Sequence, residues 1–333
     1  MKKILPLFLV LISALASFTF YSCTESVTST PIDPAALFNW SVQTSPYECY
    51  GITSLDANTY FTGTPGGLYR VTNGTPELFT VNSTVFKTIS ADAFDATYIV
   101  YGGRRVSDNI VQYMVYNSGT YTIYDAPHSA HFLYSPFISE RGTFYVSRSD
   151  SAAYYKFNNG VFTEYKVAGL NAVYFAKFNG STYAYSYDHT SAYFYKISEA
   201  GPVLLRTEPR DYSIYVLNTG MIKMENTINK ISAFTESGWT PLTTLTFSDT
   251  DYLYFRGEST NNFNIVGRDS VKQIFAYNWN GSSLVKQTNV PAEANIVGSV
   301  FWAGSEYYGN TSFFMPLDVP AGQFQKIIRM SLK

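Results

Sequence analysis

Charged residues and cysteines are scarce in this chain of 333 residues. Asp, Glu, Lys and Arg make up only 14% of the sequence, and the formal net charge is −2. Nucleic-acid binding depends on clusters of Lys and Arg, so we expect no nucleic-acid partner. The cysteines are two, Cys23 and Cys49, and Cys49 has no base beside it in the sequence that would activate a thiolate nucleophile.

Catalytic motifs are also missing from the sequence. The chain has no Gly-x-Ser-x-Gly segment, the turn that presents a nucleophilic serine in many hydrolases. Apolar residues with the helical period of 3.6 are absent after the N-terminus, so no Gly-rich phosphate loop leads into a helix. We therefore expect no cofactor and favour a non-enzymatic role, although sequence spacing does not place paired carboxylates.

Aromatic residues are abundant instead. They make up 17% of the chain, with Tyr 29 and Phe 25. Aromatic and β-branched side chains suit a pleated, half-buried surface, and many short segments alternate with period two. The sequence predicts an all-β protein.

The residues from Gly67 to Phe79 form a pattern that recurs along the chain. They read as a strand, an Asn-Gly turn and a second strand, which is the pattern of a β-hairpin. Another apolar strand, a turn and an aromatic strand precede most of the hairpins, so each repeat predicts four short antiparallel strands, the blade of a β-propeller. The turn glycines lie 37 to 45 residues apart, at Gly74, Gly119, Gly160, Gly201, Gly238 and Gly281.

We predict a seven-bladed β-propeller of four-stranded antiparallel blades within residues 36–333. The alternating segment 37–42 precedes the first blade, and its pairing with the C-terminal blade would close the ring and cover an open sheet edge. Six or eight blades stay possible because the repeat length varies. The last blade is expected to supply strands near 300–302, 312–315 and 324–330. The blades are expected near residues 49–82, 83–126, 127–168, 169–208, 209–247, 248–290 and 291–333.

The first repeat contains Tyr60-Phe61-Thr62-Gly63-Thr64 followed by Gly66-Gly67-Leu68-Tyr69-Arg70. This pattern resembles the bacterial two-component-regulator type of propeller repeat, and the pair Gly102-Gly103 resembles kelch repeats more loosely. The full match is confined to this one repeat. The resemblance implies a propeller fold and leaves the function open, and no kinase or DNA-binding region follows that would imply a sensor histidine kinase.

The N-terminus has the features of a secretory signal peptide over residues 1–22. Lys2 and Lys3 precede an apolar run that ends at Phe20, and a small residue, Ser22, stands before Cys23. A transmembrane anchor is the alternative, although the run is short and contains Pro6.

The position of Cys23 resembles a bacterial lipobox, in which the cysteine is lipidated as the first residue of the mature protein. Lipidation at Cys23 would make residues 23–35 a lipidated N-terminus and flexible tether, and several acyl chains would anchor the protein stably. The protein is then expected to be exported and held by lipid in the bacterial cell envelope, at the outer membrane or cell surface, as a monomer. Ordinary secretion with a Cys23–Cys49 disulfide is the alternative.

Propeller topology divides the connections between two faces. Those between the second and third strands, and between the fourth strand and the next blade, share one face, here called the loop face. The other connections form the opposite, turn face. Ionisable residues recur in the loop-face connections, which makes this face a candidate recognition surface. The candidate ligand-binding residues are Arg104, Arg105, Asp108, His128, His131, Arg148, Asp150, Asp188, His189, Arg210, Asp211, Arg268 and Asp269.

The same residues also have a structural interpretation. Asp and Ser cap turns, and an Arg-x-Asp pair repeated in register can be a salt bridge between blades. His128, His131 and a nearby Asp125 permit metal binding in principle. Local spacing provides no third nitrogen or thiolate ligand, although His189 could approach from the adjacent blade, and we expect no metal. Tyrosine platforms for sugar stacking are possible, although most tyrosines occupy strand positions typical of a core.

These features favour a lipid-anchored envelope module that binds a protein or glycan partner, or acts as a scaffold, through the loop face. One alternative is a carbohydrate hydrolase or lyase that uses acidic residues of the same face. Another is a purely structural envelope protein.

Overall fold

The computed structural model divides the chain into two compact units, Met1–Asp33 and Pro34–Lys333, and the second unit holds the sheets. The segment 1–22, Cys23, Cys49, His128 and His131 lie outside the described residues. The structure describes residues 33–44, 51–54, 59–64, 67–73, 75–78, 86–95, 97–105, 107–108, 110–127, 136–148, 150–170, 172–225, 228–246, 250–269, 274–288, 290, 307–308, 312–317 and 326–332.

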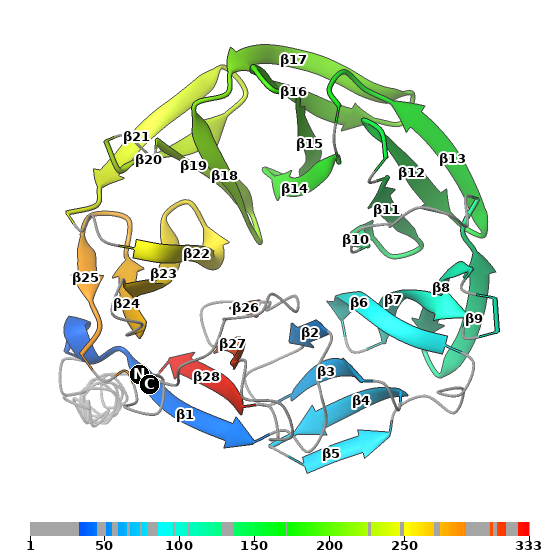
Figure 1. Ribbon diagram of the computed structural model, residues 1–333, viewed down its shortest axis with the longest axis horizontal. Helices are drawn as coiled ribbons and strands as arrows, with labels where there is room; N and C mark the ends of the chain where they lie inside the picture. Colours follow the sequence, from blue (N-terminus) through cyan, green and yellow to red (C-terminus); the bar gives the residue numbers. More distant parts are fainter. Residues whose placement is uncertain are drawn as a thin grey trace, which may run out of the picture. The chain divides into compact units, whose positions relative to one another are not determined.

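The second unit is built from four-stranded antiparallel sheets (Figure 1). In most of them the strands follow chain order, so each sheet is a meander of hairpins. The first three such sheets contain β2 (Gly51–Ser54), β3 (Thr59–Thr64), β4 (Gly67–Thr72) and β5 (Thr75–Leu78); β6 (Phe86–Asp95), β7 (Tyr98–Arg105), β8 (Val111–Asn117) and β9 (Thr120–Asp125); and β10 (Phe137–Glu140), β11 (Thr143–Ser147), β12 (Ala153–Asn158) and β13 (Val161–Lys166).

The next three sheets continue the pattern. They contain β14 (Tyr174–Phe178), β15 (Ser181–Tyr187), β16 (Ser191–Ser198) and β17 (Gly201–Pro209); β18 (Tyr212–Leu217), β19 (Gly220–Glu225), β20 (Lys230–Thr235) and β21 (Gly238–Thr244); and β22 (Thr250–Ser259), β23 (Asn262–Asp269), β24 (Ile274–Trp279) and β25 (Leu284–Lys286). The first strand of each sheet lies innermost and the fourth lies outermost (Figure 1). This arrangement is the predicted β-propeller architecture, and each of these six sheets lies within a predicted blade range, except that β17 extends one residue beyond it.

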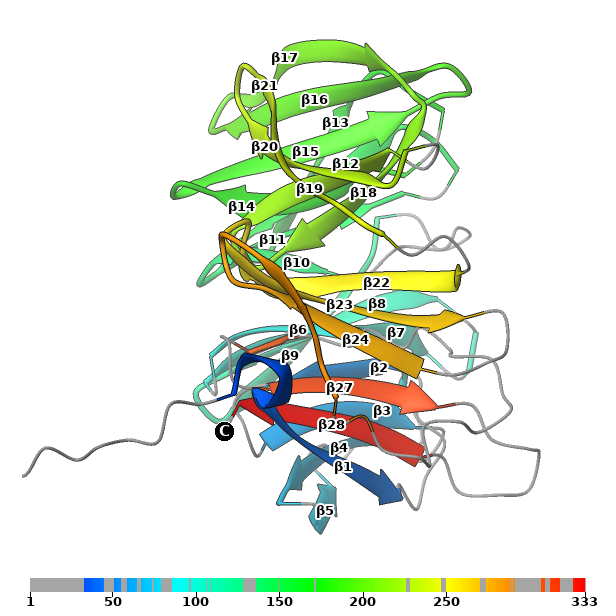
Figure 2. The same ribbon diagram turned by 90° about the vertical axis from the view of Figure 1, so that its left-hand side faces the viewer.

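One further sheet joins the two ends of the unit. It has the order β1 (Phe38–Thr44), β28 (Lys326–Leu332), β27 (Ser312–Leu317) and β26 (Tyr307–Tyr308). The pairing of β1 with β28 is antiparallel, from Phe38 opposite Leu332 to Thr44 opposite Lys326, and both ribbon views place these strands side by side (Figures 1 and 2). The predicted pairing of an N-terminal strand with the C-terminal sheet is therefore present. The expected strand near 300–302 lies outside the described residues.

The residues just before β1 contact the preceding sheet as well. The 3-10 turn η1 (Pro34–Ala36) lies beside the end of β25, where Gln287 is buried. Gln287 donates from Nε2 to the Pro34 carbonyl at 3.0 Å and accepts at Oε1 from the Leu37 N–H at 3.1 Å. The N-terminal segment thus links two sheets before it enters the second one.

The tight turns have the backbone that the sequence predicts. Asn73, Asn159 and Asn179 have φ of 51°, 46° and 47°, in the left-handed region that Asn tolerates better than most residues. Gly160 follows Asn159 with φ of 95°. Two successive residues with positive φ are the requirement of a type I′ hairpin turn, whose twist matches the flanking strands.

The core lies between neighbouring sheets, and alternate residues of one strand serve different sheets. Phe144 and Val146 of β11 pack in a buried cluster with residues of β7 and β8. Tyr145, between them in sequence, packs in another cluster with Val173 and Phe175. Because successive side chains of a strand point to opposite faces, β11 is buried on both faces along its whole length.

A buried arginine joins two of the sheets. Arg206 of β17 is only 14% exposed in its side chain. Its guanidinium carbon lies 4.7 Å from the ring centres of Phe194 and Phe234 and 5.5 Å from that of Trp239. Its Nε donates to Glu208 at 2.5 Å, so the buried charge has both a carboxylate partner and aromatic faces.

The same arginine also closes a turn of the neighbouring sheet. Its Nη1 donates to the backbone carbonyls of Thr235 and Glu236 at 2.7 and 2.9 Å. Glu208 in turn accepts from the Tyr212 hydroxyl at 2.8 Å and from the Trp239 indole N–H at 2.7 Å. The network therefore holds the sheets β14–β17 and β18–β21 together.

Replacing Arg206 by Ala should lower the free energy of unfolding by about 1.5–3 kcal/mol, because the charge-assisted hydrogen bond from Arg206 to the half-buried Glu208 is lost. Urea unfolding followed by tyrosine and tryptophan fluorescence measures the change. Lys196→Ala is the matched control, since the Lys196–Glu236 pair is 42% and 50% exposed and should contribute about 1 kcal/mol or less. Equal losses for the two variants would contradict a special role for the Arg206 network.

Candidate functional site

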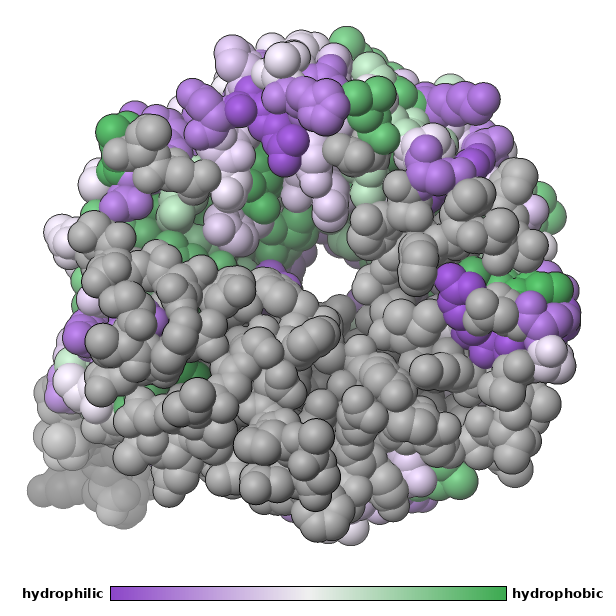
Figure 3. All heavy atoms as spheres, viewed as in Figure 1, coloured by the Kyte–Doolittle hydropathy of each residue, from purple (hydrophilic) through white to green (hydrophobic). Residues whose placement is uncertain are grey.

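The predicted charged residues fall at the loop-face ends of the strands. Arg104 and Arg105 end β7, Arg148 follows β11, Asp188 follows β15, and Arg210 follows β17. Figure 3, which shows one face of the molecule, places hydrophilic residues over the sheet β14–β17 with apolar residues between them. Several of these residues form hydrogen bonds and ion pairs within their own sheets.

Arg105 and Asp108 form a bidentate pair within one connection. Arg105 donates from Nε to Oδ1 of Asp108 at 2.8 Å and from Nη2 to Oδ2 at 2.6 Å. This donation holds the pKa of Asp108 below its usual value of 3.8. Arg105 also lies 3.7 Å from the Asp125 carboxylate, so all three charges belong to the sheet β6–β9.

Arg148 is bound in the same way by two carboxylates of its own sheet. It donates to Asp150 at 2.9 and 2.6 Å and to Glu164 at 2.6 Å, and its side chain is 15% exposed. The repeated Arg–Asp pairs therefore form within a sheet and stabilise its connection, rather than joining neighbouring sheets.

Asp188 is occupied by its own loop. Its Oδ1 accepts from the N–H groups of Thr190 and Ser191 at 2.8 and 2.7 Å, and its Oδ2 accepts from the Tyr193 hydroxyl at 2.7 Å. These hydrogen bonds, led by that of Tyr193, lower the pKa of Asp188 from 3.8 to about 2. A carboxylate with this pKa and these partners caps a turn and is a poor general acid or base.

The remaining predicted residues are scattered. His189 and Asp211 are exposed on the loop face, and Arg104 is half-buried at the end of β7. Asp269 ends β23 and is half-buried, and of Arg268 the structure describes only the backbone. Arg210 differs from these residues because it lines a cavity.

This cavity lies at the loop face between the sheets β14–β17 and β18–β21 and has a volume of about 250 Å³. It is smaller than the roughly 300–1,000 Å³ typical of pockets for drug-sized ligands, so it suits a single small group. None of its lining side chains is a carboxylate. They are Tyr174, Tyr185, Tyr187, Ala192, Arg210, Tyr212, Ser213 and Ile214.

A stack of tyrosines forms one side of the cavity. Tyr174 and Tyr185 are opposite each other in the β14–β15 register, and their rings are parallel to within 15° with centres 4.9 Å apart. The Tyr187 ring, two residues along β15, lies 6.0 Å from that of Tyr174 at 10°. The hydroxyls of Tyr174 and Tyr187 are 3.4 Å apart, so two groups that can donate or accept converge at one point.

Arg210 covers the outer end of this stack. Its guanidinium carbon lies 3.8 Å from the centre of the Tyr187 ring, and Nη1 donates to the Asp188 carbonyl at 3.1 Å. Arg210 is exposed, and among the described residues it forms no ion pair. It therefore presents a positioned cation and free N–H donors, the geometry that recognises a carboxylate or another oxyanion.

The tyrosines of this cavity are not among the candidate residues predicted from the sequence. Tyr183, Tyr185 and Tyr187 alternate along one strand, which is also the pattern of a core, and Tyr183 and Tyr185 are indeed buried. Tyr187 differs because it is the last residue of β15, where the two sheets separate. A tyrosine at the loop-face end of a strand, followed by charged residues, was the available signal.

A second group of charges lies on the inner strands of consecutive sheets. The Asp92 carboxylate on β6 accepts from the Ile138 N–H of β10 at 2.6 Å and from the Ala93 N–H at 2.9 Å. Burial raises the pKa of Asp92 from 3.8 to about 6, against these hydrogen bonds and the attraction of Lys177 on β14. Burial also lowers the pKa of Lys177, which interacts with Asp92 and Glu140. Asp92 thus ties neighbouring sheets together while carrying a costly charge.

The described residues contain no group of three or more His, Cys, Asp or Glu side chains arranged to hold a metal ion. No helix within them has the length and hydropathy needed to cross a bilayer.

Comparison with known proteins supports the fold and does not assign a family. No protein-family model and no curated protein sequence matches the chain. Solved structures do match, each at a TM-score of 0.55 to 0.59: a streptogramin B lyase, 14% identical over 90% of this chain and 100% of its own; YCF48 bound to D1 peptide, 12% identical over 91% and 98%; and a xyloglucanase from Xanthomonas campestris, 11% identical over 86% and 55%. These structural matches establish a β-propeller. Because the identities are so low, they leave the function open.

Replacing Asp92 by Asn should change how stability depends on pH. The folded protein binds the Asp92 proton more tightly than the unfolded chain, so this carboxyl favours folding most at low pH, and its contribution is lost as pH rises from about 4 through about 6. The free energy of unfolding of Asp92→Asn minus that of the wild type should therefore be larger at pH 7 than at pH 4.5. Urea midpoints of both proteins at the two pH values measure the difference, and parallel pH profiles would contradict the assignment.

Proposed function

We propose that this protein is a lipid-anchored module of the bacterial cell envelope that binds a protein or glycan partner through the loop face of a seven-bladed propeller. The observation that carries the proposal is the cavity beside Arg210. A tyrosine stack, a pair of hydroxyls and an exposed guanidinium there are presented by rigid strands. Rigid aromatic and cationic groups in a concave site are typical of binding surfaces.

The other features of the proposal come from the sequence. The signal segment and Cys23 support export and lipid attachment at the outer membrane or cell surface, and the net charge of −2 gives no reason to expect nucleic acid. Seven blades fit the repeat count, and the pairing of β1 with β28 supports a closed ring. A monomer is expected.

The chemistry of the cavity limits the kinds of partner that it could bind. Arg210 favours a partner that presents a carboxylate or another anionic oxygen group beside a polar ring or chain. The burial-raised pKa of Tyr185 keeps its phenol neutral, so the tyrosines act as hydrogen-bonding and packing groups. The alternative of a carbohydrate-active enzyme receives no support from this site, because no carboxylate lines the cavity and Asp150 and Asp188 are engaged in their own connections.

The site is tested by capture of the partner from envelope extract and by binding to a glycan array. Tyr187→Ala and Arg210→Gln should each weaken binding roughly tenfold or more, as expected for an aromatic or arginine residue at the centre of an interface. Tyr187→Phe keeps the ring under Arg210 and should lose less. Lys286→Gln, an exposed change on β25, is the matched control and should bind normally. Undiminished binding by both Tyr187→Ala and Arg210→Gln would remove the site from the proposal.

Membrane attachment is tested separately. In cells fed a labelled fatty acid, the wild-type protein should carry the label and sediment with the envelope. Cys23→Ser should lose the label and be released into the soluble exported fraction, because the acyl chains are then absent. Cys49→Ser should behave as the wild type. A label that persists in Cys23→Ser, or a Cys23–Cys49 disulfide found in the mature protein, would contradict the anchor.

A further inference from the structure

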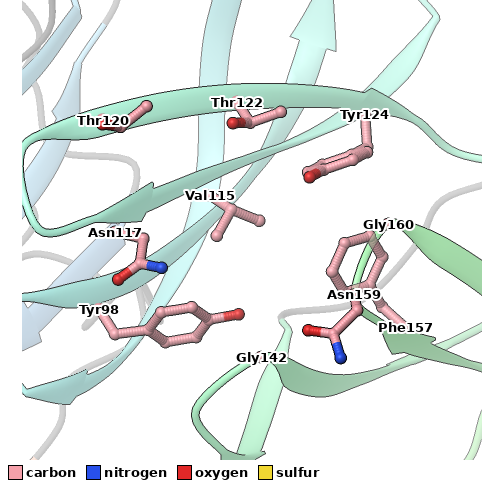
Figure 4. Close-up of a pocket in the computed structure, with 10 residues that line it drawn as sticks. All are labelled: Tyr98, Val115, Asn117, Thr120, Thr122, Tyr124, Gly142, Phe157, Asn159 and Gly160. Atoms are coloured by element: carbon pink, nitrogen blue, oxygen red, sulfur yellow. The ribbon is translucent and has the colours of Figure 1, made fainter.

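A second cavity of about 250 Å³ opens at the turn face, between the sheets β6–β9 and β10–β13 (Figure 4). It is separate from the loop-face cavity, because it is formed at the opposite ends of the strands and by different sheets. Its lining residues are Tyr98, Val115, Asn117, Thr120, Thr122, Tyr124, Gly142, Phe157, Asn159 and Gly160.

Two hairpin turns keep this space open. Gly142 and Gly160 have φ of 87° and 95°, where a side chain is disfavoured. A Cβ atom at Gly142 would stand 3.0 Å from Oδ1 of Asn159, and one at Gly160 would stand 3.7 Å from the Tyr124 ring. The turns therefore bring the Asn159 amide to the edge of the cavity without filling it.

Most polar side chains around the cavity have no hydrogen-bond partner within the described part of the chain. Among the described residues, the hydroxyls of Thr120, Thr122 and Tyr124 and the side-chain amide of Asn159 form no hydrogen bond. Figure 4 shows the Tyr98 hydroxyl and the Asn159 amide directed into the same space, with Thr122 and Tyr124 above them on β9. Tyr98 is 2% exposed, and among the described residues no side chain pairs with its hydroxyl, which lies near the Gly142 backbone.

The apolar part of the cavity is aromatic. The rings of Tyr124 and Phe157 meet edge to face with centres 4.8 Å apart, and the buried Val115 also lines the cavity. A ligand held here would contact a ring surface on one side and hydroxyl and amide groups on the others. Such mixed surroundings suit a compact ring that carries several hydroxyl groups.

The cavity presents no net charge to a ligand. None of its lining side chains is ionisable at neutral pH, because burial raises the pKa of Tyr98 above 10. The nearest guanidinium, that of Arg141, is paired with Asp95 at 2.6 Å and donates to Oδ1 of Asn117 at 3.0 Å. An ionic ligand would lose its hydration without gaining a counter-charge, so the site favours a neutral one.

We propose that this turn-face cavity binds one neutral monosaccharide unit, with Thr122, Tyr124 and Asn159 as its hydrogen-bonding groups. The inference does not depend on the proposed function, because it concerns another face of the protein and a neutral rather than an anionic ligand. A protein with both sites would hold a neutral sugar on one face and an anionic partner on the other.

The test uses the full-length protein in detergent micelles and a panel of methyl glycosides of glucose, galactose and mannose, with glucuronic acid as the charged comparison. Saturation-transfer NMR and titration should show that at least one neutral glycoside binds and that glucuronic acid binds more weakly. Thr122→Val and Tyr124→Phe remove one hydroxyl each with little change of shape, and each should lower the affinity roughly threefold to tenfold. Thr163→Val, at an exposed position of β13, is the matched control and should bind as the wild type.

The loop-face variants separate this proposal from the proposed function. Tyr187→Ala and Arg210→Gln should leave the affinity for the neutral glycoside unchanged. Loss of that affinity in either variant, equal affinity in Thr122→Val, Tyr124→Phe and the wild type, a preference for glucuronic acid, or no binding of any neutral glycoside at millimolar concentration would each overturn the assignment.

Discussion

Each sheet of this protein has to bury both of its faces against neighbouring sheets. The inner strands meet this constraint with apolar and aromatic residues at successive positions, as β11 does when Phe144 and Tyr145 pack into different clusters. Hydrophobic burial on both sides, rather than charge, therefore holds the sheets in order. The scarcity of charged residues agrees with the same constraint, because inner strands such as β7 and β11 are buried at nearly every position.

The charged residues that remain are concentrated where strands end, and most of them stabilise the connections. Arg105 and Arg148 are satisfied by carboxylates of their own sheets, and Asp188 is satisfied by its loop. Arg206 is enclosed by three aromatic rings between two sheets. Arg210 stands apart from these, since it is exposed and stacked on Tyr187. The loop-face cavity is thus defined by the one described cation of the candidate set that stays exposed and forms no ion pair.

Much of the fold could be predicted from the sequence because its determinants are local. Period-two alternation marked the strands, and Asn-Gly and similar pairs marked turns such as Asn159–Gly160, where positive φ is required. The β1–β28 pairing was also predictable, because an unpaired edge needs a partner. The site was harder to predict. Arg210 was among the candidates, but Tyr174 and Tyr187 come together only through the β14–β15 register, and their alternation is the same as that of buried tyrosines. Asp92, Ile138 and Lys177 lie on the inner strands of consecutive sheets, so no local sequence pattern indicates that they come together.

The proposed role of this protein depends on a partner that binds at the loop-face cavity. Hydrogen–deuterium exchange of the protein, alone and with the captured partner, tests that claim most directly because it reads every segment at once. We predict that added partner slows exchange in residues 187–192 and 210–214 and leaves the outer strands β13 and β17 unchanged. Slowed exchange confined to the outer strands, with 187–192 and 210–214 unaffected, would contradict it.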